Sequence, residues 1–237
     1  MERLDKVLAG TGRWSRREVK DLVRQGRVRI DGVTARTAEE KLDPDAAAIS
    51  VDGQPVETER FTYVMLHKPA GVLSATEDSR QSTVLDLLPP ELRKRGLSPV
   101  GRLDKDTEGL LLLTNDGALA HRLLSPKSHV DKVYYTRVEG TLEPADTAAF
   151  AAGMTLGDGL CCLPAGLEIL SAGEESEAHV TLREGKFHQV KRMLASRGKP
   201  VTYLERIRMG NLTLDENLPR GGYRFLLPEE VDCLRKN

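Results

Sequence analysis

GRLDKDTEGLLLLTNDG, residues 101–117, is the most informative stretch of this 237-residue chain. Three acidic side chains, Asp104, Asp106 and Glu108, precede the continuous apolar run 110–113, which has the length of a buried strand. A carboxylate at the edge of a buried strand is rigidly placed, and its neighbours can tune its reactivity. The spacing therefore makes Asp104 a candidate catalytic carboxylate, although such a pattern is more often an acidic turn exposed to solvent.

The sequence around this stretch predicts more strands and short helices. Strands without regular helical crossovers favour an antiparallel α+β fold. We therefore expect a catalytic domain over residues 59–237, built on a mainly antiparallel sheet flanked by helices. The apolar patterns place strands at 63–66, 110–113, 133–138 and 180–182, and helices at 83–88, 118–124 and 189–196.

Residues 1–58 predict a separate small domain with two helices and a hairpin. Leu4, Val7 and Leu8 form one apolar helical face, and Ser15 with Glu18 forms a capping box for a second helix. The dipeptide Asp31-Gly32 is typical of a type I′ hairpin turn. The acidic segment 57–60 is the expected linker to the catalytic domain.

Charge is segregated along the chain although the formal net charge is only -1. Residues 1–36 hold ten basic and five acidic side chains, and residues 183–208 hold eight basic and two acidic ones. Two basic regions on a neutral protein favour directed contact with a polyanion, whereas charged runs are also common on ordinary solvated surfaces. The candidate phosphate contacts are a helical ridge, Arg16, Lys20 and Arg24, and the adjoining hairpin residues Arg27 and Arg29.

Several function classes are excluded by what the sequence lacks. No run of 18 apolar residues exists, and the charged start of the chain does not look like a secretory signal, so we expect a cytoplasmic protein without a membrane span. Three cysteines make neither a disulfide framework nor a four-ligand zinc site. Phosphate-loop, zinc-hydrolase and serine-elbow motifs are missing, so no metal and no ATP is expected.

Five segments, in order, resemble one family of RNA-modifying enzymes. The run 3–33, with SRREVKDLVRQGRVRIDG inside it, resembles the alpha-L RNA-binding module. GRLDKDTEGLLLLTND resembles the signature of the ribosomal pseudouridine synthases. The remaining three matches are MLHKPAG at 65–71, KVYY at 132–135 and EGKFHQVKRM at 184–193. The likeness covers nearly the whole chain.

The resemblance implies roles for four residues. Asp104 is the essential carboxylate, which either attacks the sugar or abstracts a proton to give a glycal. Tyr134 matches the tyrosine that stacks on the flipped base, and Arg102 matches the arginine that enters the space the base leaves. Lys191 matches the basic residue that faces the aspartate and keeps it ionised. The reaction is an isomerisation, so no cofactor is expected.

The third motif, HQVKRM, is most similar to the branch that modifies 16S rRNA of the small subunit. We expect a monomer whose partner is that RNA or a small-subunit assembly intermediate. The alternatives are a 23S rRNA pseudouridine synthase, a non-catalytic RNA-binding assembly protein on the same fold, and, more remotely, a glycosidase. His67 departs from the family, which more often has asparagine there, and this leaves the contacts of that loop open.

Overall fold

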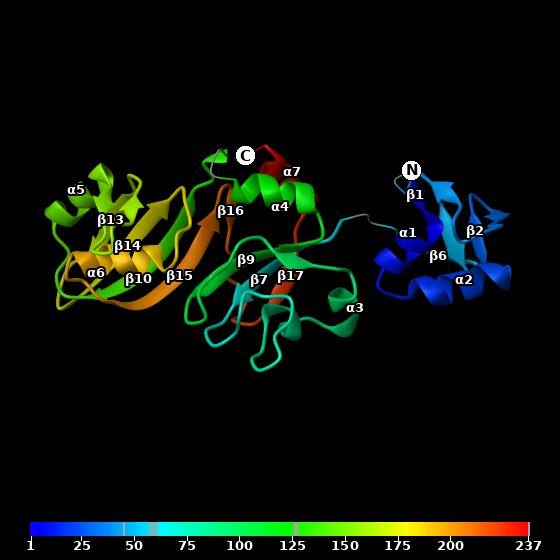
Figure 1. The fold of residues 1–237 in the computed structure, drawn as a ribbon, viewed down its shortest axis with the longest axis horizontal. Helices are drawn as coiled ribbons and strands as arrows, with labels where there is room; N and C mark the ends of the chain where they lie inside the picture. Colours follow the sequence, from blue (N-terminus) through cyan, green and yellow to red (C-terminus); the bar gives the residue numbers. More distant parts are fainter. Residues whose placement is uncertain (45, 57, 59–60, 126–127, 237) are drawn as a thin grey trace.

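The computed structural model describes residues 1–237 except 45, 57, 59–60, 126–127 and 237. In Figure 1 the N-terminal residues form a body at one end of the molecule, and the remaining residues form a larger α+β body. The expected linker 57–60 lies outside the described residues except for Thr58. The division at 58/59 therefore stays a prediction.

The N-terminal body packs two helices on short strands. The Ser15 side chain accepts a hydrogen bond from the Glu18 amide, and the Glu18 carboxylate accepts one from the Ser15 amide, which confirms the capping box. Asp31 (φ 50°) and Gly32 (φ 79°) turn the chain as a type I′ hairpin requires. The helices are α1 (Leu4–Gly10) and α2 (Arg16–Arg24); the strands are β1 (Glu2–Arg3), β2 (Val28–Ile30), β3 (Val33–Thr34), β4 (Lys41–Leu42), β5 (Ile49–Val51) and β6 (Gln54–Pro55).

A nine-stranded sheet forms the centre of the larger body, with the path β13-β14-β10-β15-β9-β7-β17; β16 pairs with β15, and β8 with β9. All described pairs are antiparallel except β15 with β9, which are parallel. The strands are β7 (Tyr63–Lys68), β8 (Ser98–Pro99), β9 (Glu108–Thr114), β10 (Lys132–Glu139), β13 (Gly166–Ser171), β14 (Glu175–Leu182), β15 (Val201–Met209), β16 (Leu212–Thr213) and β17 (Tyr223–Phe225). A separate hairpin joins β11 (Met154–Thr155) to β12 (Cys161–Cys162).

Strand β9 is apolar throughout its centre because both of its faces are buried. Leu111 and Leu113 belong to one core and Leu110 and Leu112 to another. Helix α6 (Gln189–Ser196) packs on the first core, while α4 (Gly117–Leu124) and α7 (Pro228–Arg235) cover the second. A strand buried on both faces loses the polar alternation of a surface strand. The other helices are the 3-10 turn η1 (Val84–Leu87), α3 (Pro90–Arg93) and α5 (Pro144–Ala152).

The parallel contact between β9 and β15 depends on Gly109. A Cβ built there would lie 2.4 Å from the Arg206 carbonyl oxygen, and its φ of +100° also favours glycine. The loop that ends at β9 is thereby drawn to the centre of the sheet. Among the described residues no helix combines the length and apolar character needed to span a bilayer.

Candidate active site

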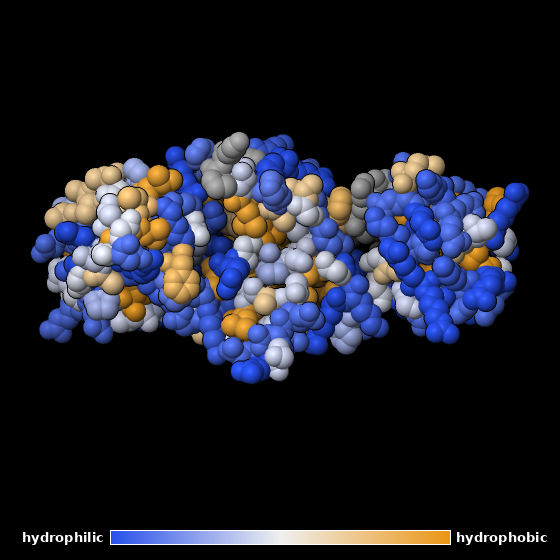
Figure 2. Space-filling view, viewed as in Figure 1, coloured by the Kyte–Doolittle hydropathy of each residue, from blue (hydrophilic) through white to orange (hydrophobic). Residues whose placement is uncertain are grey.

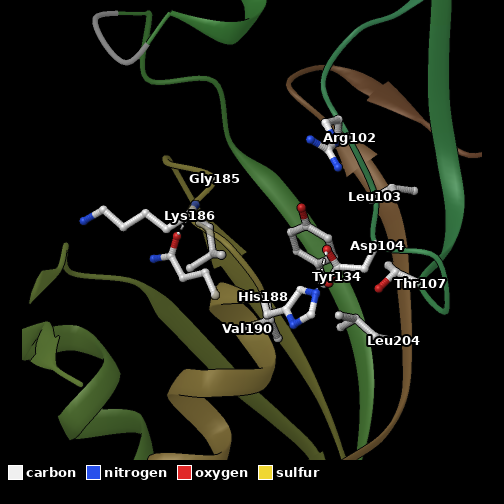
Figure 3. A pocket seen from close by; sticks show the side chains of 12 residues that line it. Arg102, Leu103, Asp104, Thr107, Tyr134, Gly185, Lys186, His188, Val190 and Leu204 are labelled. Atoms are coloured by element: carbon white, nitrogen blue, oxygen red, sulfur yellow. Dashed lines mark hydrogen bonds and ion pairs between the residues drawn. The ribbon is translucent and has the colours of Figure 1, made fainter. Parts of the chain in front are cut away.

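A pocket of about 70 Å³ opens beside the loop that precedes β9. Figure 3 shows side chains of that loop, of strands β10 and β15, and of the segment that leads into and begins α6; Leu182 at the end of β14 also lines the pocket. Arg102, Asp104 and Tyr134 all line it, together with His188. The tertiary structure thus brings together three of the four residues singled out in the catalytic domain, and the fourth, Lys191, lies within ion-pair distance of Asp104.

Two basic side chains approach the Asp104 carboxylate. Lys191 Nζ lies 3.8 Å from Oδ2, and His188 Nε2 lies 3.6 Å from Oδ1. His188 is the residue before α6 and has a left-handed backbone (φ 50°), which turns its ring toward the pocket. The ring also stacks on the exposed Phe187 at 3.8 Å between centroids. From the sequence motif alone, His188 is expected to be structural or to contact RNA and not to act as a general base. Its proximity to Asp104 comes from the turn that starts the helix.

Lys191 is hydrogen bonded to a second carboxylate. Its Nζ lies 2.5 Å from Oδ1 of Asp106, closer than to Asp104. The hydrogen bond from Lys191 lowers the pKa of the Asp106 carboxyl below its usual value. Asp106 and Asp104 therefore share one ammonium group, an arrangement that the expected pairing of Lys191 with Asp104 alone does not include.

Lys68 anchors the backbone of this loop. The side chain is fully buried at the end of β7, and its Nζ donates to the carbonyls of Asp104, Lys105 and Thr107 at 3.0, 3.2 and 2.8 Å. A further bond to the Pro69 carbonyl measures 3.0 Å. Burial lowers the pKa of Lys68 to about 8. The sequence identifies this lysine only as part of the motif at 65–71. Its four acceptors cannot be predicted from neighbouring residues, because three of them lie 36 to 39 residues away.

Tyr134 and Arg102 border the pocket from two sides. Tyr134 is buried on β10, and Figure 3 shows its ring beside Asp104; Leu204 and Val190 line the same pocket. Arg102 extends into the same space from the loop, and no described residue forms an ion pair or hydrogen bond with it. An aromatic face and an available guanidinium beside a carboxylate suit a site that receives a planar, neutral base from a polyanion.

His67 has a structural role in this chain. Its Nδ1 lies 2.7 Å from the Leu218 carbonyl oxygen and its Nε2 lies 3.0 Å from Glu205 Oε1. The ring is buried and is not among the residues that line the Asp104 pocket. The departure from asparagine is therefore accommodated by contacts to neighbouring segments, away from the reacting carboxylate.

The five basic residues predicted on the N-terminal body are all exposed, and Figure 2 shows a largely hydrophilic surface there. Arg16 and Arg29 have no ion pair among the described residues. Lys20 lies 3.4 Å from Glu39, Arg27 lies 2.5 Å from Asp52, and Arg24 pairs with Asp21. Exposed pairs of this kind contribute little stability, so they leave the cations available to a polyanion.

Comparison with known proteins decides the family. Residues 62–196 match the family described as RNA pseudouridylate synthase, and residues 2–47 match the S4 domain family. The chain belongs to the RNA pseudouridine synthases. It is 48% identical over 99% of its length to an uncharacterised RNA pseudouridine synthase, YtzG, of Bacillus subtilis, covering 98% of that protein.

A relative with a named substrate and a solved structure extend the match. The chain is 41% identical to the ribosomal small subunit pseudouridine synthase A of Pseudomonas aeruginosa, covering 97% of this chain and 98% of that one. A crystal structure of a pseudouridylate synthase matches with a TM-score of 0.69 and 35% identity, covering 99% of this chain and all of the other. The predicted α+β fold, the RNA-binding module and the isomerase class are confirmed.

Proposed function

We propose that this enzyme converts one uridine of 16S rRNA to pseudouridine through Asp104. The observation that carries the proposal is the position of the Asp104 carboxylate, in a pocket with Tyr134 and Arg102 and within 4 Å of two basic side chains. Similarity to small-subunit synthases supports the choice of RNA, because it extends over nearly both full chains. A large-subunit synthase B of Vibrio cholerae is 38% identical, but the match covers only 74% of that longer protein.

The chemistry needs one bond broken and one formed at the same sugar carbon. The N1–C1′ bond of uridine breaks, the uracil turns within the pocket, C5 bonds to C1′, and the C5 proton is lost while N1 gains one. Asp104 either attacks C1′ or removes a ribose proton to give a glycal. Tyr134 stacks on the extruded base, Arg102 occupies the space it leaves, and Lys191 supplies a positive charge beside the carboxylate.

We further propose that residues 1–58 bind RNA and residues 59–237 carry out the reaction. The exposed cations of the N-terminal body would contact phosphates without reading bases. A monomer is the proposed active form. Ribosome biogenesis in the cytoplasm is the proposed setting.

The deciding experiment maps pseudouridine in the rRNA of cells with and without this protein. We expect one 16S position to lose its pseudouridine, to regain it with the wild-type gene, and to stay unmodified with Asp104→Asn, whose folding is checked by thermal melting. Loss of pseudouridine from a position in 23S rRNA instead would indicate a large-subunit pseudouridine synthase. Restoration by Asp104→Asn would contradict the catalytic role of this carboxylate.

A further inference from the structure

A second cavity adjoins the Asp104 pocket. It has a volume of about 500 Å³ and shares Arg102, Tyr134, Gly185 and Lys186 with that pocket. Its own lining includes two cations from the central strands, Lys132 on β10 and Arg206 on β15. The two cavities therefore meet at Tyr134, and a molecule bound in one lies next to the other.

Arg206 is buried without a charged partner. The side chain is 2% exposed, and its Nε donates to the Leu110 carbonyl at 2.9 Å. Its Nη2 is buried and has no hydrogen-bond partner among the described residues. No carboxylate among the described residues forms an ion pair with Arg206 either. The buried guanidinium therefore has an unsatisfied hydrogen-bond donor, and a group bound in the cavity would have to supply the acceptor.

Lys132 adds a second buried cation to the same wall. It is 8% exposed, and its Nζ donates to the Val130 carbonyl at 3.3 Å. Burial, and then the charge of Arg206, lowers the pKa of Lys132. The adjacent acid, Asp131, is hydrogen bonded to Arg183 at 2.8 Å.

The carboxylate in the cavity lining does not neutralise these cations. Glu184 accepts hydrogen bonds from Gln189 Nε2 at 2.6 Å and from the Leu163 amide at 2.9 Å, and it pairs with Lys186 at 2.9 Å. The positive charges of Lys132 and Arg206 repel each other, and burying them costs solvation energy. Such an unfavourable arrangement is typical of a site that binds an anion. The charge pattern is that of an anion site.

We infer that this cavity binds an RNA phosphodiester group next to the target uridine, with Lys132 and Arg206 as its buried ligands and Arg102 at its entrance. The inference rests on the proposed function for the identity of the anion. RNA brings a phosphate on each side of every nucleotide, and Tyr134 separates this cavity from the pocket of the base. The site would fix the backbone while the base is extruded.

The test uses a pentanucleotide, AAUAA, whose single uridine fixes the register. Each of its linkages is replaced in turn by an uncharged methylphosphonate, and Kd is measured by fluorescence anisotropy for wild type, Lys132→Met and Lys199→Met. Wild type should lose about tenfold in affinity at one linkage flanking the uridine. Lys132→Met should bind the unmodified RNA about tenfold more weakly and become insensitive at that linkage. Lys199, outside both cavities, should leave the sensitivity unchanged.

Thermal melting separates binding from a structural role. Without RNA, Lys132→Met should melt at or above the wild-type temperature, because it removes one of two repelling buried charges. A lower melting temperature with unchanged RNA affinity would make Lys132 structural and overturn the inference. Equal losses of RNA affinity at that linkage in the wild type and in Lys132→Met would also overturn the inference. So would a wild type whose affinity no methylphosphonate changes. If Lys132→Met removes the sensitivity to the methylphosphonate but the protein modifies no rRNA, the proposed function fails and the phosphate site stands.

Discussion

At the scale of single residues, the reacting carboxylate is one of two that share a cation. Lys191 lies 2.5 Å from Asp106 and 3.8 Å from Asp104, and His188 approaches Asp104 from another side. Asp106 is exposed to solvent, whereas Asp104 faces the pocket. Asp106 thus positions the ammonium group, and Asp104 receives its field at the place where the substrate binds.

Replacing Lys191 with methionine should make the reaction more sensitive to acid. Lys191 Nζ lies 3.8 Å from the Asp104 carboxylate, so the substitution removes a positive charge that favours the ionised form of the reacting group. The acidic limb of the kcat/KM profile should therefore move to higher pH, with about 10- to 100-fold loss near neutrality and partial recovery above it. The measurement is kcat/KM on unmodified rRNA from about pH 5.5 to about pH 9, a range that brackets the acidic limb.

Asp106→Asn is the matched control for that variant. It keeps Lys191, which can then turn fully to Asp104, so less than about threefold loss is expected. An Lys191→Met enzyme equally impaired at every pH would show that the lysine holds RNA and does not act through the charge of the carboxylates.

At the scale of elements, the loop before β9 is fixed at both ends. Gly109 lets β9 approach β15, and Lys68 at the end of β7 binds the loop carbonyls. Leu103 adds a third attachment, because its amide and carbonyl both bond to the Ser74 hydroxyl at 3.0 and 2.9 Å. The Asp104 backbone is therefore held by two neighbouring segments before any substrate arrives.

Lys68→Met should loosen this loop. The variant removes the charged donor from four carbonyls; those of Asp104 and Lys105 keep the Thr107 and Gly71 amides, whereas the buried Thr107 carbonyl loses the lysine. The free energy of unfolding should therefore fall by about 2–4 kcal/mol. Displacement of Asp104 should lower kcat about 100-fold with a smaller change in KM. Denaturant unfolding and single-turnover kinetics measure the two effects.

Lys105→Met is the control for Lys68→Met, because the side chain of that exposed lysine donates to Gln81 and not to the loop carbonyls. It should change the free energy of unfolding by no more than about 0.5 kcal/mol. Equal effects of both variants would show that the hydrogen bonds from Lys68 to the four carbonyls do not matter.

At the scale of the whole molecule, the N-terminal body and the larger body have separate cores. The first is formed by apolar residues between Leu4 and Val56, and the others by residues from Val64 onward. Separate cores let each part fold with its own apolar contacts. The basic surface thus lies on a body distinct from the one that carries Asp104.

Deleting residues 1–58 should weaken RNA binding and spare the chemistry. Removing one phosphate contact flattens the dependence of log K on log salt by about 0.7 to 0.9, so three or four contacts correspond to roughly 2 to 4 units. KM should rise, and kcat at saturating RNA should change little, because distant binding acts equally on substrate and transition state. A truncated enzyme with wild-type KM and salt slope would show that the N-terminal body does not engage the substrate.

The sequence by itself determined the local elements and the family. The β9 run, the Ser15 capping box, the Asp31-Gly32 turn and the helix at 189–196 depend on neighbouring residues, and all four are present. The helix expected at 83–88 is a shorter 3-10 turn, Val84–Leu87, that stops before two prolines. The apolar pattern predicts no strand over Val201–Met209, because charged residues interrupt it there.

Only the tertiary structure decided which charges meet. Lys191 and Asp106 are 85 residues apart, Lys68 reaches carbonyls up to 39 residues away, and Arg206 is buried although charged residues surround it in the sequence. Contacts of this range follow from the pairing of strands far apart in the sequence: β7 with β9, β10 with β15, and β15 with β9. Local periodicity carries no record of that pairing, so the anchoring of the catalytic loop and the buried cation pair became visible only in the folded chain.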